Sequence, residues 1–349
     1  MDQPVEAKLN KDQKLQEKSD SSIPHGRHET QVWAIGECDL SKHFTSCTKN
    51  PDHKRFIPIN QFTLEHLPDG YRDEDTFQYI KTKADLTVRV AVTAVSPDRP
   101  EFWLGSHDPY PFYQCGENIH RSGTGEMNII KFVDGKGFDA RGNVYNVLDE
   151  QYGRDYKVCT CEQCQKLCTK KTEWWEITVH TAAHVVFDEL EAKHTSCRLF
   201  FDEEDCLLVI LENARIDYVN MDRDVCVLKF ATHDQQLEDK LVQLVRRSAD
   251  LSEKLLEKYR SSQRTDDKFN FIVSHPHGCF KQVSIGEWIE NLRIMEGNEK
   301  YDFTKLTYTT ATCLGSSGAM VYCLGIGTHH IHCGTYGSTN YSGVCVYHK

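Results

Sequence analysis

Short β-like runs separated by turn residues are the feature that most constrains the fold of this chain. The runs are Trp174–Val179, Cys197–Phe201, Leu207–Leu211, Val225–Phe230 and Phe269–Val273. Their length and turn punctuation are typical of a sandwich or barrel, and not of parallel βαβ units. We therefore expect an all-β protein.

Two further segments have a readable period. Between Leu86 and Val92, apolar residues alternate with Thr87, Arg89 and Ala91, which predicts a half-buried strand. Between Leu237 and Tyr259, apolar residues recur at spacings that place them on one helical face. This second segment predicts a helix that covers or bridges barrels.

Length and charge divide the 349 residues further. Residues 1–30 carry eleven formal charges and few apolar side chains, so they predict a disordered charged tail. Residues 31–119 are mixed in composition and predict an accessory β-containing region. Residues 120–349 then form the main domain. The whole chain exceeds the usual ~100–200 residues per domain, which predicts a tail plus one large domain or two smaller ones.

Composition also limits the partners. The chain has 52 acidic against 41 basic residues, a net charge of −11, which disfavours nucleic acid as a partner. No run approaches the ~20 apolar residues that cross a bilayer, and the first residues lack the layout of a signal peptide. We expect a cytoplasmic protein without a membrane partner, whose fifteen cysteines are mostly free thiols or metal ligands.

The segment 311–348 contains no Asp, Glu, Lys or Arg, yet it holds seven glycines, four cysteines and four histidines. Such a segment is not an ordinary solvated surface. It predicts strands and tight turns that line an interior or a cleft. For the histidines at 329, 330 and 332, cleft lining is favoured over a metal tract, because neighbours in a strand face opposite sides.

Three local patterns supply the groups that serine acyl transfer needs. They are T-A-A-H-V at Thr181–Val185, D-V-C-V-L-K at Asp224–Lys229 and G-S-S-G-A at Gly315–Ala319. A hydroxyl attacks, an imidazole takes its proton, and a carboxylate holds the imidazole. The predicted catalytic residues are thus His184, Asp224 and Ser317. Asp222 is the rival acid.

These patterns resemble the chymotrypsin-like or trypsin-like serine endopeptidases, whose triad also runs His, Asp, Ser. The separations here are 40 and 93 residues. The stretch Ser122–Gly125 resembles the strand that opens the family's first barrel, and Ser274–Gly278 resembles the start of the second. The resemblance covers about 120–349 and implies a trypsin-like double β-barrel with an inter-barrel helix.

The resemblance also implies a binding site. The backbone N–H groups of Gly315 and Ser317 would form the oxyanion hole. Ala311, His332, Cys333 and Gly334 would bind substrate. Ala311 stands where trypsins carry an acid, so selection of Lys or Arg is not supported, and His332 is a candidate for reading a polar or amide side chain.

One departure from the family concerns activation. Ser316 stands where the family usually has Asp or Asn, and the chain has no Ile-Val-Gly-Gly start. We therefore expect that any peptidase activity needs no proteolytic maturation, and that the full-length protein already reacts with a serine probe.

A cysteine cluster interrupts the predicted first barrel at 159–168. Cys159, Cys161, Cys164 and Cys168 lie within ten residues, and the C-x-x-C spacing suits tetrahedral zinc. A structural zinc site is therefore one expectation. The alternatives are a reduced surface loop and, less favoured, a redox pair.

Together the observations predict a serine endopeptidase that acts on a protein or peptide substrate without a catalytic cofactor. The alternative is a catalytically inactive, protease-like module that binds protein partners through its cleft or its cysteine-rich loop. Neither the natural substrate nor the oligomeric state is legible in the sequence.

Overall fold

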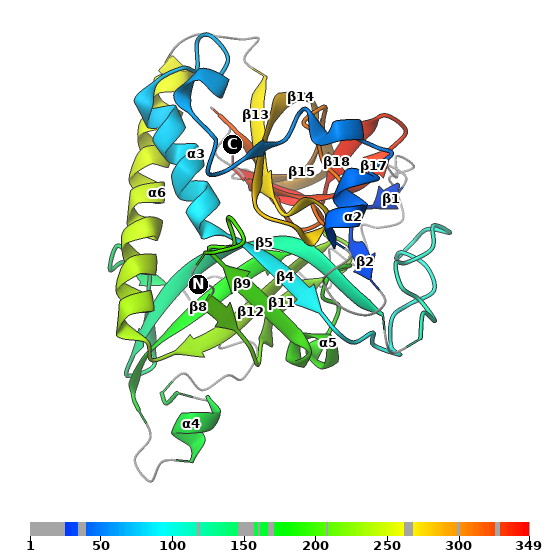
Figure 1. Ribbon diagram of the computed structural model, residues 1–349. Helices are drawn as coiled ribbons and strands as arrows, with labels where there is room; N and C mark the ends of the chain where they lie inside the picture. Colours follow the sequence, from blue (N-terminus) through cyan, green and yellow to red (C-terminus); the bar gives the residue numbers. More distant parts are fainter. Residues whose placement is uncertain are drawn as a thin grey trace.

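Two antiparallel sheets dominate the computed structural model of the chain (Figure 1). The structure describes residues 25–33, 40–116, 119–145, 157–159, 161–166, 171–206, 209–261, 268–298, 301–324 and 329–348. Each sheet carries one part of the site described below.

The first sheet has the strand order β10-β9-β4-β5-β8-β12-β11. Its strands are β4 (Thr87–Val92), β5 (His120–Val133), β8 (Glu173–Thr181), β9 (Thr195–Leu199), β10 (Val209–Leu211), β11 (Arg215–Asn220) and β12 (Val225–Thr232). The short strands β2 (Gln31–Trp33), β6 (Lys136–Phe138) and β7 (Val144–Tyr145) extend it, β2 and β6 by pairing with β5. In the described residues this sheet is an open half-barrel.

The second sheet closes on itself. Its strands are β13 (Phe269–Ser274), β14 (Gln282–Asn298), β15 (Tyr301–Tyr308), β16 (Met320–Cys323), β17 (His329–Tyr336), β18 (Thr339–Ser342) and β19 (Cys345–His348), with β1 (Arg27–His28) and β3 (Ile57–Pro58) at its margins. Because β15 pairs with both β14 and β18, six strands form a closed barrel. The expectation of an all-β double-barrel protein is confirmed.

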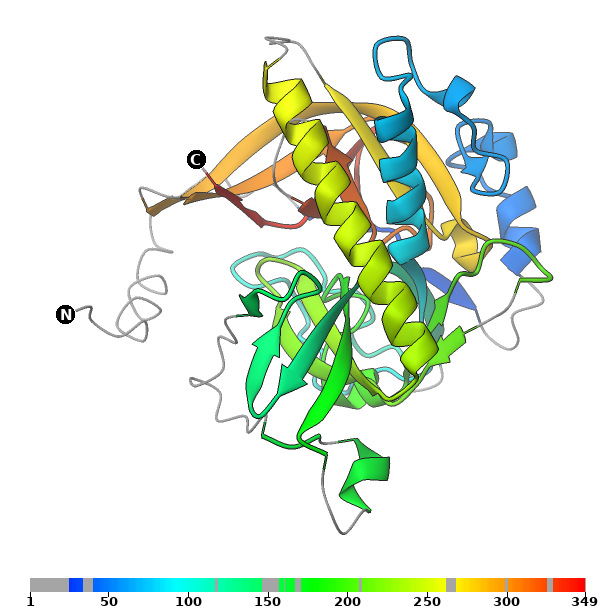
Figure 2. The ribbon, with the colours of Figure 1, turned by 90° about the vertical axis from the view of Figure 1, so that its left-hand side faces the viewer.

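The helices lie outside the barrels. The longest are α3 (Glu74–Leu86) and α6 (Gln235–Ser261); the shorter ones are α2 (Leu40–Thr45), α4 (Glu162–Gln165), α5 (Glu189–Lys193) and the 3-10 turns η3 (Pro51–His53), η4 (Leu64–His66) and η6 (Pro276–Gly278). Figure 2 shows α6 running beside α3 across the flank of both barrels.

The helix predicted between the barrels is present as α6. It begins two residues before Leu237, and Leu241 and Leu255 are buried on its inner face. Ion pairs from Lys254 to Asp75 and from Lys258 to Asp73 fasten it to the start of α3. None of the described helices combines the length and the apolar character that a membrane span requires.

The prediction of a separate accessory region over 31–119 needs correction, because β4 lies between β5 and β9 inside the first sheet. All six of its positions are buried, so it is not the half-buried strand that its alternation suggested. The face expected in solvent is covered, since the Arg89 guanidinium lies over the rings of Trp33 and Phe201. The barrel therefore begins before residue 120.

The prediction of a disordered tail over 1–30 also needs correction at its end. Residues 25–30 are described, and β1 pairs with β17 of the second barrel. The earlier residues lie outside the described part of the chain.

Candidate active site

Three side chains that are distant in sequence meet between the two barrels. His184 Nε2 lies 2.8 Å from Ser317 Oγ, and His184 Nδ1 lies 2.7 Å from Asp224 Oδ2. All three are buried. If the Nδ1–H donates to Asp224, the Nε2 lone pair faces the serine hydroxyl and can accept its proton.

Asp224 is held in a tight turn before β12. Its φ of 54° is left-handed, and its N–H donates to the Met221 carbonyl at 3.0 Å. Its second oxygen, Oδ1, accepts the backbone N–H of His184 at 2.9 Å. Burial tends to raise the pKa of Asp224, but the charge and hydrogen bonds of His184 lower it to about 2. The rival Asp222 is exposed.

A buried ionic cluster supports the loop that carries His184. Glu191 of α5 pairs with Arg99 at 2.7 Å and with Arg121 at 2.5 Å, and all three side chains are fully buried. Arg99 also donates to the His184 carbonyl at 3.1 Å, and Arg121 donates to the Val185 carbonyl at 3.0 Å. The pKa of Glu191 stays low despite its burial, because the two arginines hold its charged form.

Ser317 lies in a turn that two glycines make. Gly315 has a φ of 93° and Gly318 a φ of 90°, which glycine adopts without strain. A Cβ on Gly315 would also lie 2.4 Å from the carbonyl oxygen of His275. Positive φ angles and this crowding explain why glycine lies on both sides of Ser317 in the turn.

Ser316 holds this turn from inside. Its Oγ accepts the N–H of Cys313 at 3.2 Å and lies 3.1 Å from Ser274 Oγ, while the Thr124 hydroxyl donates to the Gly315 carbonyl at 2.8 Å. The loop is thus ordered by its own polar contacts, without the ion pair that trypsin activation creates.

The two N–H groups predicted to form an oxyanion hole face a carbonyl oxygen from the chain itself. The N–H groups of Gly315 and Ser317 donate to the Glu29 carbonyl at 2.6 and 3.2 Å. The N–H of Glu29 lies 3.0 Å from Ser317 Oγ. Two donors therefore converge on one carbonyl beside the nucleophile, which is the arrangement that stabilises a tetrahedral oxyanion.

The segment before Glu29 lies antiparallel to β17. Arg27 pairs with Thr335 and His28 with Gly334, and the N–H of Glu29 donates to the Cys333 carbonyl at 3.3 Å. A Cβ on Gly334 would lie 2.1 Å from the Arg27 carbonyl oxygen, so the close approach needs glycine there.

His332 and Lys49 form the end of the pocket that receives the Glu29 side chain. His332 Nε2 lies 2.8 Å from Glu29 Oε2, and its Nδ1 lies 2.5 Å from the Tyr308 hydroxyl. Lys49 pairs with Glu29 Oε1 and donates to Thr312 Oγ1 at 2.9 Å. The structure thus places His332 against a carboxylate.

The other predicted pocket residues have different surroundings. Ala311 is buried in a small apolar cluster with Phe56 and Cys313, and not at the Glu29 carboxylate. Cys333 contributes its backbone carbonyl. His330, two residues before His332, lies on the same face of β17, where its Nδ1 lies 3.0 Å from Ser342 Oγ. The side chain of residue 329 lies outside the described set.

Three of the predicted metal ligands lie together in the first barrel. Cys159, Cys161 and Cys164 surround His233 Nε2 at 3.6, 3.5 and 3.2 Å, and one ligand atom from each of the four residues lies within 4.8 Å of the others. Cys168, the fourth predicted ligand, lies outside the described residues. This Cys₃His group suits the donor set and reach of tetrahedral zinc.

Sequence reasoning missed Glu29, Lys49 and His233. Glu29 and Lys49 lie in segments with no periodic signal, so only tertiary structure brings them to the pocket. His233 had a usable signal, because it follows the predicted strand Val225–Phe230, whose antiparallel partner β8 starts beside the cysteine loop.

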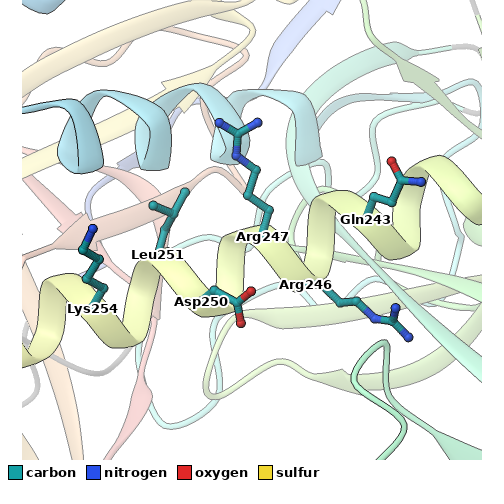
Figure 3. Close-up of a pocket in the computed structure, with 6 residues that line it drawn as sticks. All are labelled: Gln243, Arg246, Arg247, Asp250, Leu251 and Lys254. Carbon is teal, nitrogen blue, oxygen red and sulfur yellow. The ribbon is translucent and has the colours of Figure 1, made fainter.

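A shallow pocket elsewhere takes no part in this site (Figure 3). All of its lining residues belong to α6: Gln243, Arg246, Arg247, Asp250, Leu251 and Lys254. It contains no residue of the triad or of the oxyanion loop.

No protein-family model matches this chain, and no curated protein sequence matches it. Among solved structures, the protease Rv3671c of M. tuberculosis in its active form aligns over 76% of this chain and 79% of its own, with 11% identity and a TM-score of 0.37. The HtrA-type protease AlgW with a tripeptide aligns over 76% and 58%, with 12% identity and a TM-score of 0.36.

A third similar structure, a human pathogenic astrovirus serine protease, aligns over 75% of this chain and 91% of its own, with 14% identity and a TM-score of 0.28. Likeness at this level concerns the backbone arrangement alone. The chemistry of the site therefore rests on the distances between its own residues.

Proposed function

We propose that this chain is a serine endopeptidase. The observation that carries the proposal is that Ser317 lies beside both a general base and a pair of backbone N–H donors. His184 Nε2 lies 2.8 Å from Ser317 Oγ, and two N–H groups meet at a carbonyl oxygen beside that hydroxyl. General-base activation and oxyanion stabilisation are the two requirements of acyl transfer by serine.

In the proposed reaction, Ser317 Oγ attacks the substrate carbonyl while His184 Nε2 takes the hydroxyl proton. Asp224 holds the imidazole and stabilises its cation. The N–H groups of Gly315 and Ser317 bind the oxyanion. The intermediate collapses when His184 returns the proton to the leaving amine, and a water then hydrolyses the acyl-enzyme by the same route.

A fluorophosphonate probe tests this proposal directly. We expect covalent labelling of Ser317 in the wild-type protein, no labelling of Ser317→Ala, and wild-type labelling of Ser338→Ala, which changes an exposed serine. Because the Glu29 carbonyl occupies the oxyanion hole, Glu29→Ala serves as a second protein with a weakened occupant. The inactive-module alternative predicts no labelling in any of these proteins.

We also propose that Cys159, Cys161, Cys164 and His233 bind a structural zinc ion. In support, one sulfur or nitrogen atom from each residue lies within 4.8 Å of the others. Burial raises the pKa of Cys159 to about 12 and also raises that of Cys164, so without a cation these two thiols stay protonated. Zinc would take them as thiolates and join the loop at 159–164 to the end of β12. Cys161→Ser should remove one equivalent of zinc measured by elemental analysis, whereas Cys206→Ser should not.

A further inference from the structure

We propose that the chain cleaves itself between Glu29 and Thr30, and that its S1 pocket selects glutamate. This inference rests on the proposed peptidase function and adds its substrate. The segment around Glu29 makes the backbone contacts of a bound peptide: a carbonyl in the oxyanion hole, an N–H on Cys333, and a two-residue ladder on β17.

The Glu29 side chain fits its pocket by charge and by hydrogen bonding. It is 2% exposed, and its two carboxylate oxygens have separate partners, His332 and Lys49. Lys49 is itself held by Thr312 Oγ1 at 2.9 Å and Asn340 Oδ1 at 3.0 Å. The Lys49 side chain is 36% exposed, and its ammonium group faces the buried Glu29 carboxylate. An anionic side chain is favoured at this position because it makes a charge-assisted hydrogen bond, whereas a lysine would bring two like charges together.

Residues on both sides of the Glu29–Thr30 bond are anchored. Before it, His28 lies beside His184 with ring centroids 5.7 Å apart, and His25 stacks on Trp103 at 4.2 Å. After it, Gln31 pairs with Ser122 of β5 and accepts a contact from His277 Nδ1 at 2.9 Å. Contacts on both sides therefore hold the Glu29–Thr30 bond in place beside the triad.

The reaction balances with groups already present. Ser317 Oγ bonds to the Glu29 carbonyl carbon, and its proton passes to His184. The bond to the Thr30 nitrogen breaks as His184 protonates that nitrogen. Water then hydrolyses the ester. The products are residues 1–29 with a free carboxylate on Glu29, and residues 30–349 with a free amine on Thr30.

The full-length chain tests this inference by intact mass and N-terminal sequencing after purification. We expect the wild-type protein to lose residues 1–29 and begin at Thr30. Ser317→Ala and Glu29→Lys should remain full length, and Glu65→Lys, which changes an exposed glutamate, should be cut like the wild type. The peptide Gly-Arg-His-Glu-Thr-Gln-Val should then be cut after Glu about 100-fold faster than its Lys counterpart.

Two results separate this inference from the proposed function. If the probe labels Ser317 in Glu29→Ala, yet the wild type stays uncut and the peptide shows no preference for Glu, the self-cleavage and the pocket assignment are overturned while the peptidase remains. If the probe labels no protein, the peptidase proposal fails and self-cleavage fails with it.

A second inference rests on a different cluster. The structure assigns a second zinc site to Cys47, His53, His277 and Cys313. One ligand atom from each lies within 4.8 Å of the others, and Cys47 Sγ lies 3.4 Å from Cys313 Sγ, which lies 3.5 Å from His53 Nε2. Two sulfurs and two imidazoles at these separations match a Cys₂His₂ zinc set.

The surroundings of the cluster are those of metal ligands. His277 Nδ1 lies 2.9 Å from Gln31 Oε1, which fixes that nitrogen as the protonated one. His277 Nε2 is buried and has no hydrogen-bond partner. The Asn50 N–H and side-chain amide lie 3.4 and 3.1 Å from the two sulfurs, so they can donate to thiolates.

The backbone conformation of the two histidines also supports a metal site. His53 and His277 have φ values of 49° and 56°, a left-handed conformation that is strained for histidine. The turns that carry them therefore give up backbone stability to bring both rings to the cysteines. Lys49, which contacts Glu29, lies between Cys47 and His53, so the metal would also hold the S1 cation in place.

Metal content of the purified full chain tests this second site. With the Cys₃His site, we expect two zinc ions per chain, falling to one in Cys47→Ser and to one in Cys161→Ser, with no change in Cys115→Ser. After cobalt substitution, Cys47→Ser and Cys161→Ser should each show the thiolate-to-cobalt absorption of one site, and Cys115→Ser that of both. Two zinc ions in Cys47→Ser, or one in the wild type that Cys161→Ser removes, would overturn the assignment.

Discussion

Asp224 uses its two carboxylate oxygens for two tasks. One accepts from the His184 ring at 2.7 Å, and the other accepts the His184 backbone N–H at 2.9 Å. In the proposed mechanism, the first contact selects the ring tautomer that leaves Nε2 free to accept a proton. The second fixes the position of the loop that carries the ring.

Asp224→Asn should therefore lower the rate of Ser317 labelling by about 10⁴-fold, because an amide donor stabilises the wrong tautomer and loses the charge that supports the imidazolium. The matched variant Asp222→Asn changes an exposed acid and should stay within about twofold of the wild type. Labelling kinetics with both proteins would decide. Equal losses in the two variants would show that Asp224 is not the orienting acid.

In the proposed S1 pocket, Lys49 provides the positive charge that faces Glu29. Lys49→Met should lower kcat/KM for a Glu-containing peptide by about 10–100-fold, since a charge-assisted hydrogen bond contributes about 1.5–3 kcal/mol. The same substitution should affect the Gln-containing peptide much less. Lys54→Met, which changes an exposed lysine five residues away, is the control. A parallel loss on both peptides would mean that Lys49 supports the fold and not the selection.

At this scale the sequence could identify groups that sit inside distinctive local boxes. His184, Asp224 and Ser317 each lie within such a local sequence pattern, and the order of the three patterns along the chain pointed to a triad. Glu29 and Lys49 stand in ordinary charged surroundings. No local pattern marks them, because their roles arise only when β1 lies on β17.

Among the elements, α5 is short but central. Its Glu191 joins Arg99 and Arg121 and also accepts the N–H groups of Ser96 and Phe187 at 2.9 and 2.8 Å. One carboxylate thus connects the segment at 96–99, the start of β5 and the His184 loop.

Glu191→Ala should destabilise the protein by about 3–5 kcal/mol, because it leaves two buried guanidinium groups without their counter-charge. Glu212→Ala removes an exposed acid and should change the free energy of unfolding by less than about 0.5 kcal/mol. Urea unfolding of both variants in the Ser317→Ala protein measures the difference. Similar midpoints for the two variants would contradict the role of the buried cluster.

The segment 25–33 should leave the cleft at low pH. Burial alone would raise the pKa of Glu29, but the His332 hydrogen bond and the Lys49 charge lower it from 4.5 to about 2. A lowered pKa means that docking is favoured by ionised Glu29 above pH 4.5 and loses this contribution as pH falls toward 2.

Trp103 reports on this release because His25 stacks on its ring. In the Ser317→Ala protein, tryptophan fluorescence should change between pH 4.5 and 2, in a step that Glu29→Gln lacks. Identical titrations of the two proteins would exclude Glu29 as the group that holds the segment.

Helices and strands were predicted correctly where side chains follow a clear period. Burial was predicted wrongly where residues distant in sequence cover a face that was expected to be in solvent. The apolar face between Leu237 and Tyr259 predicted α6 closely. The alternation over 86–92 identified β4 as a strand but not its burial, because Trp33 and Phe201 come from elsewhere to cover Arg89. The charges of residues 1–30 predicted disorder. This was wrong for residues 25–30, because the residues that neutralise the Glu29 charge are distant in sequence.

On the scale of the whole molecule, the two barrels share one hydrophobic core. The same cluster of buried residues includes Val88 of the first barrel, Val273 of the second and Leu241 of α6. Such continuity means that neither barrel can lose its packing while the other keeps its own. The sequence length suggested several folding units, and it could not show that α3 and α6 join them.

We therefore expect a single unfolding transition for the described fold, even at this chain length. Leu241 is fully buried in the shared core, so Leu241→Ala should cost about 2–5 kcal/mol and shift the whole transition. Leu104→Ala, at a leucine that is 64% exposed, should change little. Urea unfolding in the Ser317→Ala protein should give the same midpoint by far-UV circular dichroism and by tryptophan fluorescence, before and after the Leu241 change. Two separated transitions, only one of them moved by Leu241→Ala, would show that the barrels unfold independently and that α6 belongs to one of them alone.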